Sequence, residues 1–394
     1  MQLISSEKLI TIMERALNLI DPRLVDHGKR VAYRLFRALH PLGVYDDAGL
    51  RDICMLGLFH DIGAYKTEDI DSILCFDTEN NWDHSVYGYL FIKYFSPIKS
   101  MAPVILFHHA HMSQMTLLNE EHRNLTQILK NLDSEDVEQI IKNQVCKDCT
   151  YIDEDAEFIR VFRKTPFSSE AMEAYIKMIV FSIDFRSPQT MIHTFAAAHA
   201  AEFIARLAKV DKSEIESLKT GAMLHDIGKM GTPLHILEGT KSGLSHSDMK
   251  IMKNHVVLSR DVLVDCVNEE VLNIAANHHE RMNGKGYPRG LNGASQAYLD
   301  RLMAVADVFS AMCVSRSYQK ALSKEKAVQV LRNMGNQNLL DKSIVDLAIN
   351  NYDEIVKFID ISSKPVIAAY EDIAKESNLI HSEKNNNSMV NYRC

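Results

Sequence analysis

The chain has 394 residues, of which 46% are hydrophobic and 24% charged, and its formal net charge at pH 7 is −8. This balance is typical of a globular protein with two or three domains, and the acidic charge argues against a nucleic acid polymer as partner, which would need a basic surface. No apolar stretch reaches the roughly 18–20 residues of a membrane span, and the first residues lack the pattern of a signal peptide, so we expect a cytoplasmic protein that contacts no membrane.

Nearly every segment of the chain has the apolar spacing of a helix. Apolar residues recur three and four positions apart, as in residues 35–42 and 203–207, and no segment alternates apolar and polar residues as a strand would. Proline is rare, with 9 in the chain, and stands mostly where a helix would begin or end. The sequence therefore predicts an all-α protein.

The first half carries a series of histidines, and two adjacent pairs in this series close apolar segments. In chain order the series is His27, which begins a predicted helix, then His60-Asp61 in MLGLFHDIG, His84, and His108-His109 at the end of MAPVILFHH. The order of the series is therefore His, His-Asp, His, His-His.

Residues 156–180 are expected to form linker helices. The stretch DEDAEFIRVF has a helical pattern, and another helix should follow Ser168-Ser169, where a serine can cap the first turn.

Shortly before the expected linker helices, Cys146 and Cys149 form a CxxC motif. A zinc or redox site would need a second cysteine pair or a thioredoxin-like sequence around it, so a loop near solvent is the better interpretation.

The second half repeats the series in the same order and at similar spacing. Its members are His193, which begins a predicted helix, His225-Asp226 in GAMLHDIGK, His255, and His278-His279 at the end of VLNIAANHH. Two occurrences of one pattern indicate a duplicated helical module. We therefore expect one domain over residues 1–155 and another over 181–370, followed by a polar, asparagine-rich tail at 380–394 that should be disordered.

Histidine and aspartate together suit divalent iron, manganese or zinc, and the absence of cysteine from the pattern weakens a structural zinc interpretation. An adjacent His-Asp pair can serve two metals, because the carboxylate can bridge them.

The last ligand should be an acid on another helix. Asp307, inside the apolar run DRLMAVADVFSAM, fits that place, since a buried lone carboxylate needs a partner. In the first half Asp133 is the best candidate, and a poor one.

The segments HDIGK at 225–229 and HHERMNGKGYP at 278–288 resemble those of HD-GYP phosphodiesterases, and the resemblance spans roughly residues 180–365. It implies two divalent metals, with iron or manganese favoured. The implied ligands are His193, His225, Asp226 and Asp307 for one metal, and Asp226, His255, His278 and His279 for the other. Asp226 and Lys229 are the implied catalytic residues, with Lys229 facing the scissile phosphate. The implied substrate contacts are Lys229, Gly286, Tyr287, Pro288 and Arg316, although a surface salt bridge is the alternative role for Arg316.

The resemblance implies a phosphodiesterase that cleaves a cyclic dinucleotide, either cyclic di-GMP or 3′,3′-cyclic GMP-AMP, to a linear dinucleotide and on to mononucleotides. This would be bacterial second-messenger signalling, with room for a homodimer and for a diguanylate cyclase or another signalling partner. A catalytically weak receptor is the alternative, because Asn283 stands where the family usually has aspartate. A phosphohydrolase acting on a nucleotide monophosphate or (p)ppGpp is a third interpretation, against which the GYP loop argues. Gln189 replaces a glutamate that adds a third metal in some members, so we expect two.

The first half resembles a general HD domain and departs from the second. Ala64 stands at the position of Lys229, and a GYP loop is missing. The sequence therefore predicts a degenerate HD domain. Two interpretations stay open: a scaffold whose histidines are remnants, or a metal site with regulatory use. The candidate ligands of that site are His27, His60, Asp61, His84, His108 and His109.

Overall fold

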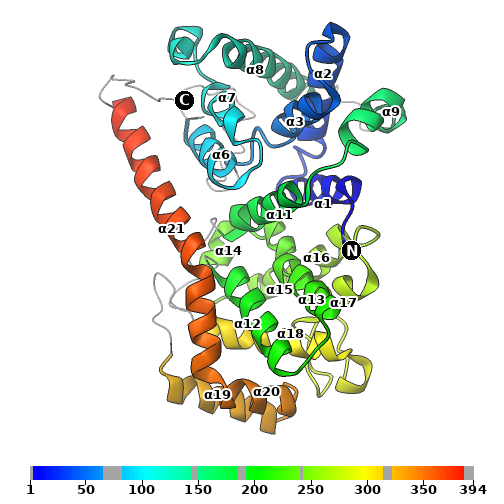
Figure 1. The fold of residues 1–394 in the computed structure, drawn as a ribbon, viewed down its shortest axis with the longest axis vertical. Helices are drawn as coiled ribbons and strands as arrows, with labels where there is room; N and C mark the ends of the chain where they lie inside the picture. The colour runs from blue at the N-terminus through cyan, green and yellow to red at the C-terminus, as the bar shows by residue number, and fades with distance from the viewer. Residues whose placement is uncertain are drawn as a thin grey trace. The chain divides into compact units, whose positions relative to one another are not determined.

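Figure 1 shows the computed structural model of the chain, which describes residues 3–64, 82–142, 149–184, 192–239, 243–313 and 322–385. Within these ranges the regular elements are helices, apart from one isolated β-bridge between Asn283 and Asn292. The all-α prediction is confirmed. The chain divides into two compact units. The first unit contains Ser5–Ser182 with the chain from Ala369 onward, and the second unit consists mainly of Ile183–Ala368.

The first unit is built from short and medium helices. They are α1 (Ser6–Asn18), α2 (His27–Leu39), α3 (Asp47–Leu58), α6 (Trp82–Phe95), α7 (Ala102–Phe107), α8 (Glu120–Ile141), α9 (Thr150–Glu154), α10 (Ala156–Phe158) and α11 (Ser169–Asp184). Helix α2 packs against α3 and α8, and α6 packs against α7. Ser168 caps α11 by accepting from the Ala171 N–H at 3.2 Å, as predicted.

The second unit repeats this construction. Its helices are α12 (His193–Leu207), α13 (Lys212–Leu224), α14 (Leu234–Glu238), α15 (His246–Lys253), α16 (His255–Leu263), α17 (Glu269–Asn277), α18 (Tyr298–Cys313), α19 (Lys324–Asn336) and α20 (Lys342–Asn350). Helix α12 packs against α18 and α13. Its buried alanines, among them Ala197, Ala200 and Ala201, are small enough to let α18 approach closely.

The last helix, α21 (Tyr352–Asn385), is longer than the sequence suggests. It contributes residues to both units, and it continues to Asn385, inside the stretch 380–394 for which disorder is expected. Residues 386–394 lie outside the described ranges. None of the helices described is both long enough and apolar enough to cross a bilayer.

Each His-Asp pair is followed, two residues after the aspartate, by a glycine at which the backbone of another segment approaches too closely for a side chain. A Cβ built on Gly63 would lie 1.9 Å from the backbone oxygen of His84, and one built on Gly228 would lie 2.0 Å from that of His255. Only glycine permits such an approach. The third histidine of each series is therefore held directly against the turn that carries the His-Asp pair.

Candidate metal centres

In the second unit, the predicted ligands stand mostly at helix ends, so that separate helices deliver them to one point. His193 begins α12, His255 begins α16, and His225 and His278 directly follow α13 and α17. Asp307 instead lies within α18. We call these residues, with Asp226 and His279, the second cluster.

Asp226 lies at the middle of the second cluster, and its two oxygens face different histidines. Oδ2 is 3.2 Å from His225 Nε2 and 3.9 Å from His193 Nε2. Oδ1 is 3.3 Å from His255 Nε2 and 4.0 Å from His278 Nε2. This division is what a carboxylate bridging two cations requires.

Asp307 completes one side of the second cluster. Its Oδ1 lies 3.1 Å from His193 Nε2, and its Oδ2 lies 3.8 Å from His279 Nδ1. The ligand atoms of His193, His225 and Asp307 all fall within 4.8 Å of one another, and so do those of His255, His278 and His279. The structure thus brings all seven predicted ligands together in two groups joined by Asp226.

Backbone carbonyls fix the orientation of three histidines. His225 Nδ1 lies 2.6 Å from Ala222 O, His255 Nδ1 lies 2.6 Å from Met252 O, and His278 Nδ1 lies 2.7 Å from Ala275 O. A carbonyl can only accept, so Nδ1 carries the proton and Nε2 presents its lone pair to the centre. This is the outer support that histidine ligands of metals usually have.

Buried polar atoms of the second cluster fit a bound cation. His225 Nε2, Asp226 Oδ1 and His279 Nδ1 are buried and have no hydrogen-bond partner among the described residues, an arrangement that costs free energy unless something binds them. Burial lowers the pKa of His255 to about 4 and that of His279 to about 3. Burial raises the pKa of Asp226, but the charges of His225 and Lys229 outweigh it and hold that pKa well below its usual value. His255 and His279 are thus neutral and Asp226 is ionised, the states that metal binding needs. Burial lowers the pKa of His225, but the charge of Asp226 outweighs it and raises that pKa.

The loop after His279 is held by Glu280, a residue that the sequence analysis does not single out. Its fully buried carboxylate accepts the Arg289 N–H at 2.7 Å and the Leu291 N–H at 2.8 Å. A Cβ at Gly286 would lie 2.4 Å from Glu280 Cα, so the loop can approach only with glycine there. The sequence signal for Glu280 is its place directly after the histidine pair, inside the segment HHERMNGKGYP.

The predicted substrate residues lie near the second cluster where the structure describes them. The Tyr287 ring lies 4.7 Å from the His279 ring, and Pro288 follows it. Lys229 Nζ pairs with Asp226 Oδ2, which puts one positive charge beside the bridging carboxylate. Lys253 Nζ, not foreseen from the sequence, lies 5.0 Å from the centre of the Tyr287 ring. Arg316, like Gln189 and Cys146, lies outside the described residues.

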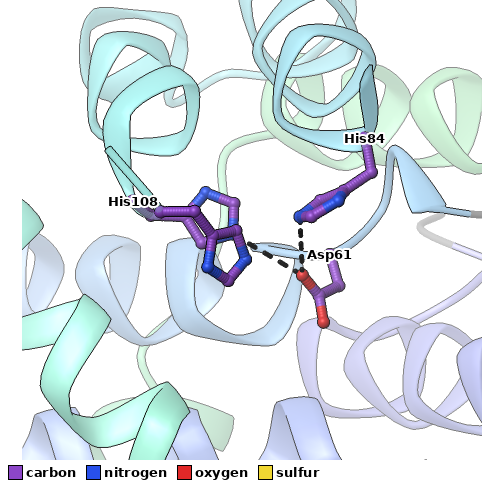
Figure 2. A group of neighbouring side chains, drawn as sticks. Asp61, His84 and His108 are labelled. Atoms are coloured by element: carbon purple, nitrogen blue, oxygen red, sulfur yellow. Dashed lines mark ion pairs between the residues drawn. The ribbon is translucent and has the colours of Figure 1, made fainter. Parts of the chain in front are cut away.

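In the first unit, the six candidate ligands also meet. Figure 2 shows Asp61 facing His84 and His108, whose Nε2 atoms lie 3.5 and 3.6 Å from Asp61 Oδ1. On the other side, Asp61 Oδ2 lies 3.4 Å from His60 Nε2 and 3.6 Å from His27 Nε2. The bridging arrangement of Asp226 therefore recurs at Asp61.

Asp133, the weak candidate for the last ligand, occupies the place that Asp307 has in the other unit. Its Oδ1 lies 3.2 Å from His27 Nε2 and 3.4 Å from His60 Nε2, and its Oδ2 lies 3.9 Å from His109 Nε2. A signal was present in the sequence of α8. Leu125, Leu129 and Val137 are buried at steps of four around Asp133, which puts the carboxylate on the apolar face.

The comparisons with known proteins agree with this geometry. Residues 175–344 match the family model described as HD domain. The chain is 25% identical over 402 residues to the 3′3′-cGAMP-specific phosphodiesterase 1 of Vibrio cholerae, covering 89% of this chain and 92% of that protein. It is 30% identical over 246 residues to a probable cyclic di-GMP phosphodiesterase of the same organism, covering 57% of this chain and 54% of that protein. The crystal structure of a cyclic GMP-AMP specific phosphodiesterase of V. cholerae superposes with a TM-score of 0.50 at 15% identity, covering 88% of this chain and 97% of that one, which shows a shared fold.

Proposed function

We propose that this chain, whose residues 175–344 match the family model described as HD domain, is a metal-dependent phosphodiesterase that hydrolyses a cyclic dinucleotide. The observation that carries the proposal is the placement of Asp226, whose two oxygens each face a separate set of buried imidazoles. The relatives named above act on cyclic dinucleotides by their names. The relative that aligns with most of this chain is named for 3′3′-cGAMP, which favours that substrate over cyclic di-GMP.

The second cluster would hold two divalent cations. His193, His225 and Asp307 would bind one, His255, His278 and His279 the other, and Asp226 both. Iron or manganese suits a set of imidazoles and carboxylates without thiolates. When bound, the cations would supply the Lewis acidity and the activated water that cleavage of a phosphate diester needs.

The remaining residues of the site act on the substrate itself. Lys229 places a positive charge beside Asp226, where it would stabilise the negative charge that grows on the phosphate oxygens in the transition state. The Tyr287 ring, set against His279 and held by the loop that Glu280 anchors, would border the substrate. A base could stack against this half-buried aromatic ring. We place this activity in the cytoplasm. The homodimer and the signalling partner stay predictions.

The test is turnover by the purified full-length protein loaded with manganese or iron, using cyclic di-GMP, 3′,3′-cGAMP and cyclic di-AMP, with products separated by chromatography. We expect a linear dinucleotide, and we expect Asp226→Asn to lower kcat by about a thousandfold, because the bridging carboxylate is lost. His199→Gln is the matched control, since His199 lies in α12 but outside the second cluster. Tight binding of a cyclic dinucleotide without turnover would favour the receptor, and neither binding nor turnover would refute both functions.

A further inference from the structure

The first unit contains a set of side chains that the family match at residues 175–344 does not reach. We call it the first cluster. It consists of His27, His60, Asp61, His84, His108, His109 and Asp133. All are buried except His109, whose side chain is 16% exposed. His279 is likewise the more exposed member of its pair, at 20%.

Ordinary buried histidines and aspartates satisfy one another through hydrogen bonds, and the first cluster does not. Both oxygens of Asp61, both ring nitrogens of His84, His108 Nε2, His109 Nε2 and Asp133 Oδ1 are buried without a hydrogen-bond partner among the described residues. Native structures leave few buried polar atoms in this condition. So many buried lone pairs around one carboxylate, Asp61, indicate a ligand that accepts lone pairs, which is a cation.

The candidate ligand atoms of the first cluster form two groups, each small enough to surround one cation. His27, His60, Asp61 and Asp133 offer ligand atoms within 4.8 Å of one another, and so do Asp61, His84, His108 and His109. Asp61 belongs to both groups: its Oδ1 faces His84 and His108 (Figure 2), and its Oδ2 faces His60. Two cations bridged by one carboxylate would satisfy the unsatisfied atoms that face the centre, and His84 Nδ1 is the exception, because Nε2 is the nitrogen of that ring that faces Asp61.

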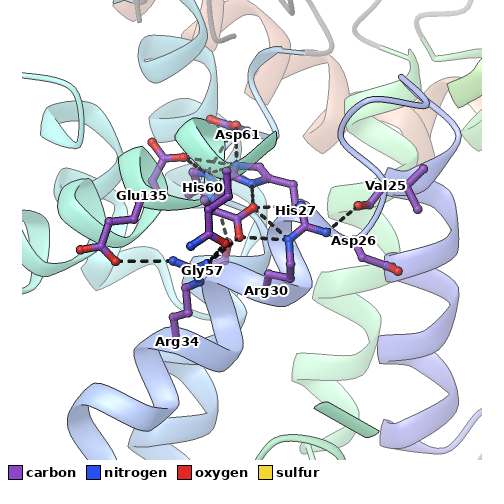
Figure 3. A network of polar contacts seen from close by, with 12 residues as sticks. Val25, Asp26, His27, Arg30, Arg34, Gly57, His60, Asp61 and Glu135 are labelled. Carbon is purple, nitrogen blue, oxygen red and sulfur yellow. Dashed lines mark hydrogen bonds and ion pairs between the residues drawn. The ribbon is translucent and has the colours of Figure 1, made fainter. Parts of the chain in front are cut away.

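The histidines of the first cluster are oriented as metal ligands are. His60 Nδ1 lies 2.7 Å from Gly57 O, and His108 Nδ1 lies 2.6 Å from Ile105 O, so in both rings Nε2 keeps its lone pair for the centre. His27 Nδ1 lies 2.9 Å from Asp136 Oδ2, and the Arg30 guanidinium holds Asp136 in turn, with Nε 3.0 Å from each carboxylate oxygen. Figure 3 shows His27 and Arg30 in this network. A carboxylate behind a histidine raises its basicity towards a metal.

We propose that the first unit holds a two-cation centre of its own, with the seven residues of the first cluster as ligands and Asp61 as the bridge. Imidazole and carboxylate donors without thiolate select divalent iron, manganese or zinc. The centre differs from that of the second unit in its surroundings, because the position of Lys229 is taken by Ala64, which is buried and carries no charge. The proposal does not depend on the catalytic function of the second cluster.

The test measures metal rather than activity. Full-length wild-type protein and variants are loaded with manganese, desalted, and analysed for metal per chain by mass spectrometry. The paired variant Asp61→Asn with Asp133→Asn should lose about half of the bound metal, because it keeps the shape of both side chains and removes their charge. Asp226→Asn with Asp307→Asn should lose the other half. Glu135→Gln, two residues from Asp133 on α8 and exposed, should lose none.

Two outcomes would overturn the proposal. One is a paired first-unit variant that is folded by circular dichroism and retains the wild-type metal content. The other is a paired second-unit variant that contains no metal, since the first cluster would then have bound nothing. The X-ray absorption spectrum of that second-unit variant is the second readout. It should report imidazole nitrogen neighbours as well as oxygen, and solvent-bound manganese without imidazole neighbours would contradict the centre.

Discussion

At the scale of the residue, the chemistry of both clusters rests on the protonation of imidazole. A histidine binds a cation only through an unprotonated nitrogen. Burial lowers the pKa of His255 to about 4 in the second unit and that of His84 to about 4 in the first. At pH 7 both rings are therefore neutral, and the carbonyl that accepts from His255 Nδ1 decides which nitrogen is available.

The same shifts predict how the stability of the metal-free protein depends on pH. A histidine with a folded-state pKa near 4 and an unfolded value of 6.5 binds its proton more readily when unfolded. The contribution of each of these two histidines to stability is then complete above pH 6.5 and is lost as the pH falls from 6.5 towards 4, by a few kcal/mol at most per histidine. Chemical denaturation of chelator-treated protein across this range measures the slope. His255→Gln should flatten it, and an equal slope in that variant would contradict the assignment.

At the scale of the element, the loop after α17 depends on one buried acid. Glu280 accepts two backbone N–H groups, from Arg289 and Leu291, and thereby sets the position of the Tyr287 ring over His279. Asn283 supports the start of the loop, because its Oδ1 accepts the Lys285 N–H at 3.0 Å. The aspartate usual in the family could accept the same bond, so the change to asparagine keeps the turn.

Glu280→Gln should therefore act on the substrate and not on the metals. The amide can accept one loop N–H but would turn its own NH₂ towards the other, so the loop should lose its position. We expect kcat/KM to fall by about 10–100-fold, as misplaced site residues typically cause, with the metal content unchanged. Steady-state kinetics and metal analysis of the same sample measure the two quantities. Glu269→Gln at the exposed start of α17 is the control, and a loss of metal in Glu280→Gln would show a structural role instead.

At the scale of the whole molecule, the chain is a duplication in which each unit gathers histidines from its own helices around one His-Asp turn. In each unit the histidine that begins a helix meets an aspartate from another helix: His27 meets Asp133 and His193 meets Asp307. These contacts join α2 to α8 in one unit and α12 to α18 in the other. Cations bound there would cross-link helices that are distant in sequence.

Removing the metal should therefore lower the stability of the folded chain. Binding to the native state alone raises the free energy of unfolding by about 3 kcal/mol when the free ligand is a hundredfold above its Kd. We expect the Tm of the chelator-treated protein to rise on addition of manganese, measured by differential scanning calorimetry. Calcium, which prefers more oxygen ligands than these clusters offer, is the control. A Tm indifferent to manganese would contradict metal binding by either cluster.

The sequence by itself determined the helical fold, the duplication and the order of the histidines, because apolar spacing and short motifs are local properties of the chain. It also pointed to Asp226 as the bridge, since that role follows from an adjacent His-Asp pair. Only the tertiary structure decided that Asp133 joins the first cluster, that Glu280 holds the loop, and that Asp136 and Arg30 stand behind His27. Each of these depends on which distant helices and loops lie side by side, and packing rather than local sequence sets that.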